Sequence, residues 1–418
     1  MNRRDFLRMM AAGGLAAGAF IYGVPRRWRR PEARAAAAGK TLVVIFQRGG
    51  CDGLNVVVPY ADNEYYALRP TIAIPAPGSG GELRPALDLN GFFGLHPSLA
   101  PLHGIFQQGR LAVLPAVHYP DGNRSHFDSE IIIESGARSK LYDGWLSRYL
   151  AANPGENTPL RAVGFGNEMP HSLRGEASAS IFNDLGDFAF GGDAHAHAFR
   201  DRLRRVYEQE PSTGQANRRL LREQGNILFD NLDFMESLDP DGYEPENGAE
   251  YPNSTYGRQL RQAAMLIKDG VGLEVAALSI GGWDTHSNQG GAQEGGYQSR
   301  RLQEFAAGIG AFYDDLGSRM ENVVLLTMTE FGRTARENGS RGTDHGNAGA
   351  WFVLGGRVRG GIYGEWPGLA PENLYRGRYL AQSLDFRDVM AEVVARHFGE
   401  PELSGVFPDH PYQPIGFL

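Results

Sequence analysis

The chain has 418 residues, of which 42% are hydrophobic and 22% are charged, and its formal net charge is −8. This composition is that of a globular protein with one large α/β domain or two smaller ones. The acidic balance argues against nucleic acid or an anionic lipid surface as a partner, and the single cysteine, Cys51, excludes an internal disulfide.

The first 38 residues have the pattern of an export signal. Arg3 and Arg4, followed by Asp-Phe-Leu, make a twin-arginine signature, and an apolar stretch of 16 residues follows over residues 9–24. A membrane span needs about 20 residues, so this stretch is short for one. Small-residue cleavage sites lie within residues 33–38. We therefore expect a signal peptide over residues 1–38, the alternative being an uncleaved N-terminal anchor.

Export by this route has consequences for location and charge. It implies the twin-arginine translocase as a partner, a periplasmic or secreted location, and no stable membrane span after cleavage. Cleavage removes eight arginines and two acids, a net of +6, so the charge falls from −8 to near −14. Because this route carries folded proteins, a metal ion could be loaded before export.

Apolar runs and amphipathic stretches alternate along the remaining chain. Buried strands are expected over residues 41–46, 111–117, 273–280 and 323–326. Helices are expected over residues 97–108, 129–136, 256–268, 297–320 and 385–398, the last with Asp385 as its cap. Residues 59–89 look irregular, and residues 194–252 could form a helical insertion or a small cap. Alternating strands and helices predict an α/β fold with a mostly parallel sheet, forming one domain over residues 39–418.

The loop after the first strand carries Arg48 and Asp52 among glycines. These glycines let the backbone turn sharply and present the carboxylate at the strand end. The alternative is that Asp52 caps its own turn.

The loop after the second strand carries Asn-Arg-Ser-His-Phe-Asp and leads into a helix. Ser125 lies near the helix start, where it could be an ordinary N-cap or a nucleophile favoured by the helix dipole and a metal ion. Base rates favour the cap if this stretch is taken alone. His126 follows it directly.

Two further loops place carboxylates beside imidazoles. Asp284 and His286 follow Gly281-Gly282-Trp283, and the fourth strand runs into Glu330, Arg333 and then the adjacent pair Asp344-His345 between glycines. Oxygen and nitrogen donors on flexible backbone are what a borderline metal ion needs.

In open α/β sheets, ligands bind outside the carboxyl ends of the strands. The four loops therefore predict one site with the inventory of a metal-dependent hydrolase. The expected metal ligands are Asp52, His126, Asp284, His286, Glu330, Asp344 and His345. The expected catalytic groups are Ser125 as nucleophile and Arg48 or Arg333 as the cation that binds an oxyanion.

The stretches RGGCDGLN, NRSHFD, GGWDTHSNQ, TEFGR and GTDHG, together with the twin-arginine start, resemble the bacterial family called domain of unknown function 1501. That family looks like a branch of the alkaline phosphatase and sulfatase superfamily. The resemblance implies a three-layer sandwich with helices on both faces of the central sheet, and hydrolysis of phosphate or sulfate esters. It also implies one or two divalent ions, with zinc favoured over calcium or manganese.

The resemblance has departures. The sequence has no Cys-x-Pro-x-Arg or Ser-x-Pro-x-Arg motif, which argues against a formylglycine sulfatase. His286 and His345 lie in convincing ligand positions, and His126 could be a third. Two functions follow. The first is an exported hydrolase acting on a small anionic ester or a sulfated or phosphorylated glycan. The second is a non-catalytic envelope binding or scaffold protein on the same fold.

Overall fold

The computed structural model describes residues 20–22, 39–155, 160–186, 202, 204–205, 234 and 237–418. The signal peptide expected over residues 1–38 and the insertion expected within residues 194–252 lie largely outside the described residues. Among the residues that are described, no helix is long and apolar enough to cross a membrane.

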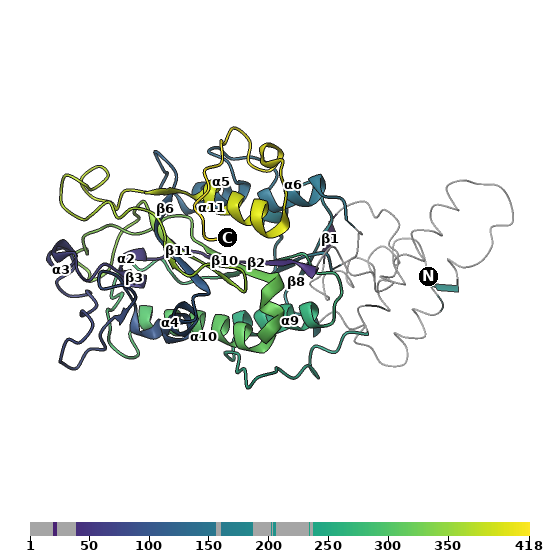
Figure 1. Cartoon of the computed structure of the whole chain (residues 1–418), viewed down its shortest axis with the longest axis horizontal. Coiled ribbons are helices and arrows are strands. Elements are labelled where there is room, and N and C mark those ends of the chain that lie inside the picture. The colour runs from purple at the N-terminus through teal and green to yellow at the C-terminus, as the bar shows by residue number, and fades with distance from the viewer. Residues whose placement is uncertain are drawn as a thin grey trace, which may run out of the picture.

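A ten-stranded sheet forms the centre of the described structure, in the order β1-β8-β7-β9-β2-β10-β11-β6-β12, with β13 also pairing with β6 (Figure 1). Its strands are β1 (Phe20–Tyr22), β2 (Thr41–Gln47), β6 (Leu111–His118), β7 (Ala162–Phe165), β8 (Ala179–Phe182), β9 (Val275–Ile280), β10 (Val323–Met328), β11 (Gly349–Gly355), β12 (Gly361–Ile362) and β13 (Leu384–Asp385). The pairs β1–β8, β10–β11 and β11–β6 are antiparallel, and the other pairs are parallel. The predicted α/β class with a mostly parallel sheet is confirmed.

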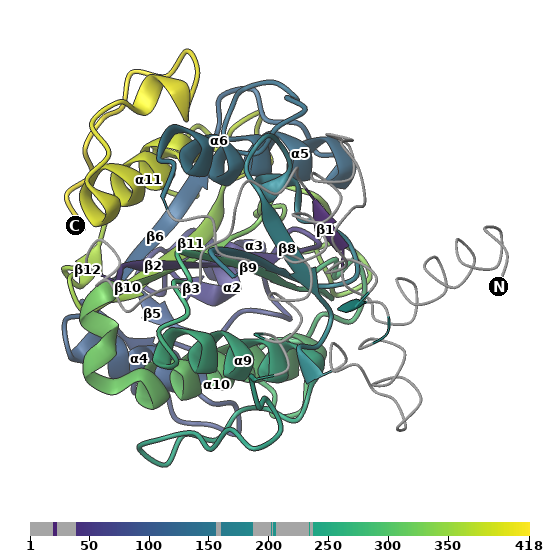
Figure 2. The same cartoon turned by 90° about the vertical axis from the view of Figure 1, so that its right-hand side faces the viewer.

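Helices cover both faces of this sheet (Figures 1 and 2). One face carries α4 (Ala100–Gln107), α9 (Thr255–Lys268) and α10 (Tyr297–Leu316), and the other carries α5 (His126–Ser135), α6 (Trp145–Ala152) and α11 (Phe386–Glu392). Alternate residues of β2 serve the two cores: Val43 and Ile45 pack on one side, while Leu42, Val44 and Phe46 pack on the other. Burial on both faces explains why the strands are unbroken apolar runs.

Short elements lie within and around residues 59–89, which the sequence suggested were irregular. A small sheet has the order β3-β5-β4. The short strands and α-helices are β3 (Val57–Val58), β4 (Leu87–Asp88), β5 (Gly94–Leu95), α2 (Gly53–Val56) and α3 (Asn63–Leu68). The remaining turns are the 3₁₀ segments η2 (Pro97–Leu99), η3 (His171–Leu173), η5 (Gly317–Asn322) and η7 (Leu403–Gly405), and the π-helical η6 (Val393–Phe398).

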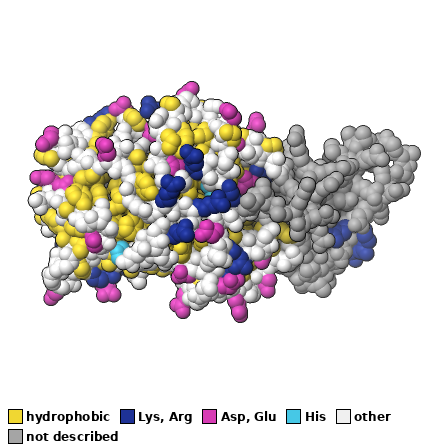
Figure 3. All heavy atoms as spheres, viewed as in Figure 1, with side chains coloured by type: hydrophobic (Ala, Val, Ile, Leu, Met, Phe, Trp, Pro, Cys, Tyr) yellow, Lys and Arg dark blue, Asp and Glu magenta, His cyan; other side chains and the backbone are white. Residues whose placement is uncertain are grey.

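The last expected helix divides into α11 and η6, and its cap is the expected one. The side chain of Asp385 accepts a hydrogen bond from the backbone N–H of Arg387. Acidic and basic side chains are mixed over the face of the molecule shown in Figure 3, with one group of basic side chains near its middle.

Strand direction positions the functional loops. β2, β9 and β10 are mutually parallel neighbours, and β6 runs with them because β11 is antiparallel to both β10 and β6. The loops that follow these four strands therefore leave the sheet at one edge, as open α/β sheets require for a ligand site.

Candidate metal centre

Glycines allow the loops at this edge to approach each other closely. Gly49 has φ +123°, and a Cβ there would lie 2.6 Å from the backbone nitrogen of Asp284. A Cβ on Gly342 would lie 2.4 Å from the carbonyl carbon of His286. Only glycine fits at both positions, so the loops after β2 and β10 lie directly against the loop after β9.

Three side chains converge at the meeting point of these loops. The Nε2 atoms of His126 and His345 are 3.0 Å apart, and the Nε2 of His345 is 3.2 Å from Oδ1 of Asp284. The Nε2 of His126 is 3.6 Å from Oδ2 of Asp284. One ligand atom from each of the three residues lies within 4.8 Å of the other two.

His286 joins the same cluster from the loop after β9. Its Nε2 lies 3.0 Å from Nε2 of His345 and 2.9 Å from Oδ1 of Asp284. His345 and Asp284 are therefore shared between two triangles of donor atoms, one completed by His126 and the other by His286. We call these four residues the histidine centre.

The far nitrogen of each imidazole is held by an acceptor. The Nδ1 of His126 donates to Oε1 of Glu330 across 2.7 Å, and the Nδ1 of His286 donates to Oδ1 of Asp344 across 3.1 Å. The Nδ1 of His345 donates to the backbone carbonyl of Arg124 across 2.8 Å. Carboxylates and carbonyls only accept, so the proton resides on Nδ1 and each Nε2 presents a lone pair. This is the arrangement of metal-binding histidines.

The spacing of the donor atoms fits a metal ion. Two lone pairs on nitrogens 3.0 Å apart repel each other, so either a proton on one of the nitrogens or a metal ion must lie between them. A tetrahedral zinc ion with nitrogens at about 2.1 Å would place neighbouring ligand atoms about 3.4 Å apart. A set of three imidazoles and one carboxylate suits zinc or another first-row transition ion better than calcium, which takes oxygen ligands.

Arg333 fixes the carboxylate of this centre. Its buried guanidinium donates to Oδ1 of Asp284 across 2.7 Å and also to the backbone carbonyl of Thr343. Burial raises the pKa of Asp284, but the hydrogen bond and charge of Arg333 outweigh that effect, and the net pKa lies below the ordinary value. Arg333 is therefore occupied by a side chain of the site, which revises the expectation that it is a free oxyanion-binding cation.

Glu330 and Asp344 were expected to be metal ligands, but each contacts the Nδ1 atom of a histidine in the cluster. Glu330 is buried and also accepts from the backbone N–H of Gly49 across 2.8 Å. Asp344 also accepts from the side chain of Asn338 across 3.1 Å. Both expected ligands are placed as hydrogen-bond partners of histidines, with their oxygens used for orientation.

The expectation for Asp52 is also revised. Both carboxylate oxygens of Asp52 bond to the guanidinium of Arg69, at 2.6 and 2.8 Å, and Oδ2 accepts from Gln289 across 2.6 Å. Asp52 and Arg69 are both buried, at 2% and 0% exposure. Their charges compensate each other inside the protein, which leaves Asp52 no free oxygen to give to an ion.

Arg48 has a comparable arrangement. It forms ion pairs with Glu130 and Glu134 of α5 at 2.7 and 3.1 Å. Burial lowers the pKa of Arg48, but the charges of these two carboxylates outweigh it and raise the pKa overall. Arg48 thus attaches the loop after β2 to α5, and its expected oxyanion role is revised.

Ser125 begins α5, as expected, but does not cap it. It is the N-cap residue, its side chain makes no cap hydrogen bond, and it is exposed. Its neighbours Arg124 and His126 both contact His345, the first through its carbonyl and the second through Nε2. The free hydroxyl is therefore carried by backbone fixed to the histidine centre on both sides.

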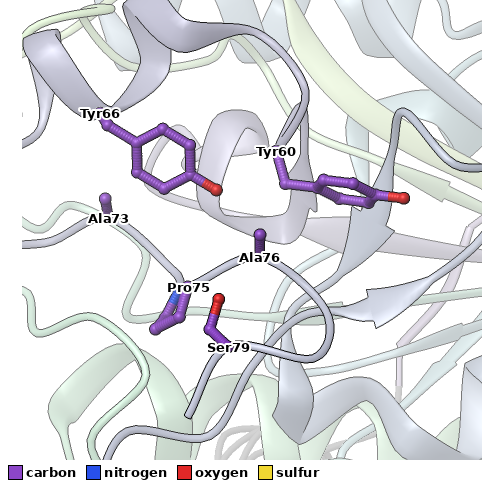
Figure 4. Close-up of a pocket in the computed structure, with 6 residues that line it drawn as sticks. All are labelled: Tyr60, Tyr66, Ala73, Pro75, Ala76 and Ser79. Atoms are coloured by element: carbon purple, nitrogen blue, oxygen red, sulfur yellow. The ribbon is translucent and has the colours of Figure 1, made fainter. Parts of the chain in front are cut away.

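A separate hollow of about 390 Å³ lies away from these residues. It is lined by Tyr60, Tyr66, Ala73, Pro75, Ala76 and Ser79. In Figure 4 the two tyrosine rings lie on either side of this space, with Ala76 between them. None of its lining residues belongs to the histidine centre.

Several residues of the site carry no signal in the sequence. Arg69 and Gln289 donate hydrogen bonds to the carboxylate of Asp52, although they lie 17 and 237 residues from it in the sequence. Arg124 contributes a backbone carbonyl, which any residue type has. A sequence pattern identifies side chains that are able to bind metal, but it does not identify which partner each one has.

The fold and the site define an α/β protein with a candidate metal centre at the carboxyl edge of its sheet. The chain belongs to the family described as protein of unknown function (DUF1501), whose model matches residues 39–405. It has no match among the curated proteins.

Solved structures resemble the chain at low identity. They include the lipoteichoic acid synthase LtaP from Listeria monocytogenes, with 9% identity, 97% of this chain and 79% of that chain covered, and a TM-score of 0.36. The phosphonate monoester hydrolase of Agrobacterium radiobacter has 10% identity, 90% and 79% coverage and a TM-score of 0.31. The 2-O GAG sulfatase BT1596 has 10% identity, 90% and 75% coverage and a TM-score of 0.30. These scores describe a loose likeness, and the function proposed for this chain rests on the side chains of the site.

Proposed function

We propose that this protein is an exported metal-dependent hydrolase of phosphate or sulfate esters that uses Ser125 as its nucleophile. The observation that carries the proposal is the convergence of three imidazole Nε2 atoms and the Asp284 carboxylate, with every Nδ1 held by an acceptor. A non-catalytic surface has no need of three imidazoles fixed in one tautomer, one of them next in sequence to a serine whose hydroxyl makes no cap hydrogen bond in the described structure.

The residues divide into ligands and supports. His126, His345 and Asp284 would hold the ion, with His286 beside His345 and Asp284 as a further donor, and zinc suits these donors best. Glu330, Asp344 and the carbonyl of Arg124 keep the imidazoles oriented, and Arg333 keeps Asp284 ionised. When bound, the ion would supply Lewis-acid polarisation of the ester and favour the serine alkoxide.

Ser125 would attack the phosphorus or sulfur atom of the ester. Its Oγ would lose a proton to solvent and form the new bond, while the bond to the alcohol oxygen breaks and the alcohol leaves. Water would then cleave the covalent intermediate and regenerate the serine. The N-terminus of α5, a helix of ten residues, favours negative charge at this position.

The location and substrate remain those that the sequence suggested. We propose export by the twin-arginine translocase to the periplasm or beyond it, and a small anionic ester or a sulfated or phosphorylated glycan as substrate. The net charge near −14 after signal removal argues against nucleic acid as a partner.

The test is hydrolysis of p-nitrophenyl phosphate, bis(p-nitrophenyl) phosphate and p-nitrophenyl sulfate by the exported, zinc-loaded protein, with Ser125→Ala as the matched control. Turnover of at least one ester that falls at least a hundredfold in the variant supports the proposal. Bound metal without turnover of any ester in a wide panel would contradict it and favour the binding or scaffold protein.

A further inference from the structure

A group of arginines beside the histidine centre has no carboxylate partner. Arg124 and Arg378 lie over the ring of Tyr379, with guanidinium carbons 4.9 and 5.6 Å from its centroid, and Arg376 lies 5.2 Å from the centroid of Tyr375. In the described parts of the chain, no acid forms an ion pair with any of the three. We call these five residues the arginine rim.

The backbone attaches the arginine rim to the proposed active site. Tyr379 forms an antiparallel bridge with Thr334, next to the bridge between Arg333 and His345. The Tyr375 hydroxyl contacts Oδ1 of Asp121 across 3.1 Å, in the loop that leads to Ser125. The rim therefore borders the nucleophile loop at both Asp121 and Arg124.

The distribution of charge separates the rim from the histidine centre. Arg48 and Arg333, on the loops that follow β2 and β10, are already paired with carboxylates. The rim contains three arginines. One carboxylate contacts it in the described structure, that of Asp121, which accepts a hydrogen bond from the Tyr375 hydroxyl. Arg376 and Arg378 are exposed, and Nη1 of Arg124 is buried with no hydrogen-bond partner in the described structure. The exposed positive charge of Arg376 and Arg378 is thus free to meet a ligand, next to the loop that leads to Ser125.

We propose that the arginine rim binds a second anionic group of the substrate, next to the ester that reacts at Ser125. This proposal rests on the proposed function and deepens it, because it makes the substrate an ester whose alcohol part carries a further sulfate or phosphate group. The planar guanidinium fork matches an oxyanion with two parallel hydrogen bonds, and stacking on tyrosine holds Arg124 and Arg378 in place for it.

The experiment measures binding without turnover, so every protein in it also carries Ser125→Ala, which removes the proposed nucleophile. Isothermal titration calorimetry at fixed low ionic strength compares sulfated maltotetraose, phosphorylated maltotetraose and plain maltotetraose as probes of the zinc-loaded protein. The rim variant is Arg124→Gln with Arg378→Gln. The matched control is Arg110→Gln with Arg319→Gln, which removes the same charge from two half-exposed arginines that are paired with acids. Metal content is measured for each protein.

We expect an anionic probe to bind the native protein and to bind the rim variant at least tenfold more weakly, with the control variant and the metal content unchanged. The ratio of affinities for the sulfated and phosphorylated probes identifies the preferred oxyanion. Equal binding by native and rim variant, or equal binding of plain and anionic probes, would overturn the proposal.

A third variant distinguishes anion binding at the arginine rim from anion binding at the metal ion. Asp284→Asn should lose metal but keep rim binding, and a tenfold loss of binding there would assign the anion to the ion and overturn the rim. If the proposed function fails instead, the anionic probe still binds at the rim while no ester is hydrolysed.

Discussion

Glu330 accepts a hydrogen bond from Nδ1 of His126 across 2.7 Å, and this contact determines which imidazole nitrogen faces the histidine centre. The hydrogen bond to Glu330, set against burial, raises the pKa of His126 above its ordinary value in the absence of an ion. Such a carboxylate makes the imidazole a stronger ligand and fixes its orientation.

Glu330→Gln keeps the size and an acceptor oxygen but removes the charge. We expect zinc affinity to fall by about 10- to 100-fold, the usual cost of losing such a partner. A competition titration with a chelating dye measures it. Glu321→Gln, on the exposed surface, is the control and should bind zinc as the native protein does. An unchanged zinc affinity in Glu330→Gln would show that Glu330 does not support metal binding through His126.

Ser125→Ala separates catalysis from folding. Replacing a serine that caps a helix costs about 1 kcal/mol. The hydroxyl of Ser125 makes no cap hydrogen bond, so we expect the urea midpoint to stay within error while ester hydrolysis is lost and zinc is retained. A clear drop in stability with activity preserved would show that Ser125 is structural.

Asp52→Asn tests whether Asp52 supports the fold or binds the ion. The change leaves the buried guanidinium of Arg69 without its counter-charge, and breaking a buried pair costs about 3 to 5 kcal/mol. We expect a large fall in the free energy of unfolding, measured in urea, with one zinc still bound per folded molecule. Asp128→Asn breaks the exposed pair with Lys140 and should change stability little. Zinc loss at full stability would return Asp52 to the ligand set.

Three buried histidines make stability depend on pH. Burial lowers the pKa of His96 and His397 to about 4 and that of His118 to about 3. The unfolded chain binds these protons near pH 6.5 whereas the folded chain does not, so stability is complete above about pH 6.5 and falls as the pH drops toward 4. Each group contributes about 1.4 kcal/mol per pH unit in this window.

His397→Gln isolates one of these groups. Glutamine can still donate to the Thr41 carbonyl that His397 contacts at 3.0 Å. Urea midpoints at pH 7.5, 6.0 and 5.0 should show a shallower decline in the variant than in the native protein. The metal centre titrates in both proteins, so its contribution cancels when the two slopes are compared. Identical slopes would contradict the assignment of this pH dependence to His397.

The sequence predicted much of the fold because the central strands are buried on both faces. The apolar runs of β2, β6, β9 and β10 mark strands without any knowledge of their partners. The position of β11 between β10 and β6, antiparallel to both, could not be predicted, since pairing depends on contacts between distant residues. Short strands such as β12 and β13 have too few residues for a pattern.

For the site, the Gly-flanked loops indicated which side chains meet but not the task of each. Glu330 and Asp344 have the chemistry of ligands, and only their orientation toward Nδ1 atoms makes them partners of histidines. Trp283, which directly precedes Asp284, is buried and donates to the carbonyl of Ile280 at 2.8 Å. Burial of this kind is decided by the packing of distant elements.

The most direct measurement is elemental analysis of the folded protein together with His345→Ala and Asp344→Ala. His345 belongs to both triangles of donor atoms, whereas Asp344 only orients His286. We expect one zinc or similar ion per native molecule, none in His345→Ala, and a weakly bound but measurable ion in Asp344→Ala. A native protein without metal, or a His345→Ala variant that keeps its full complement, would contradict the metal centre.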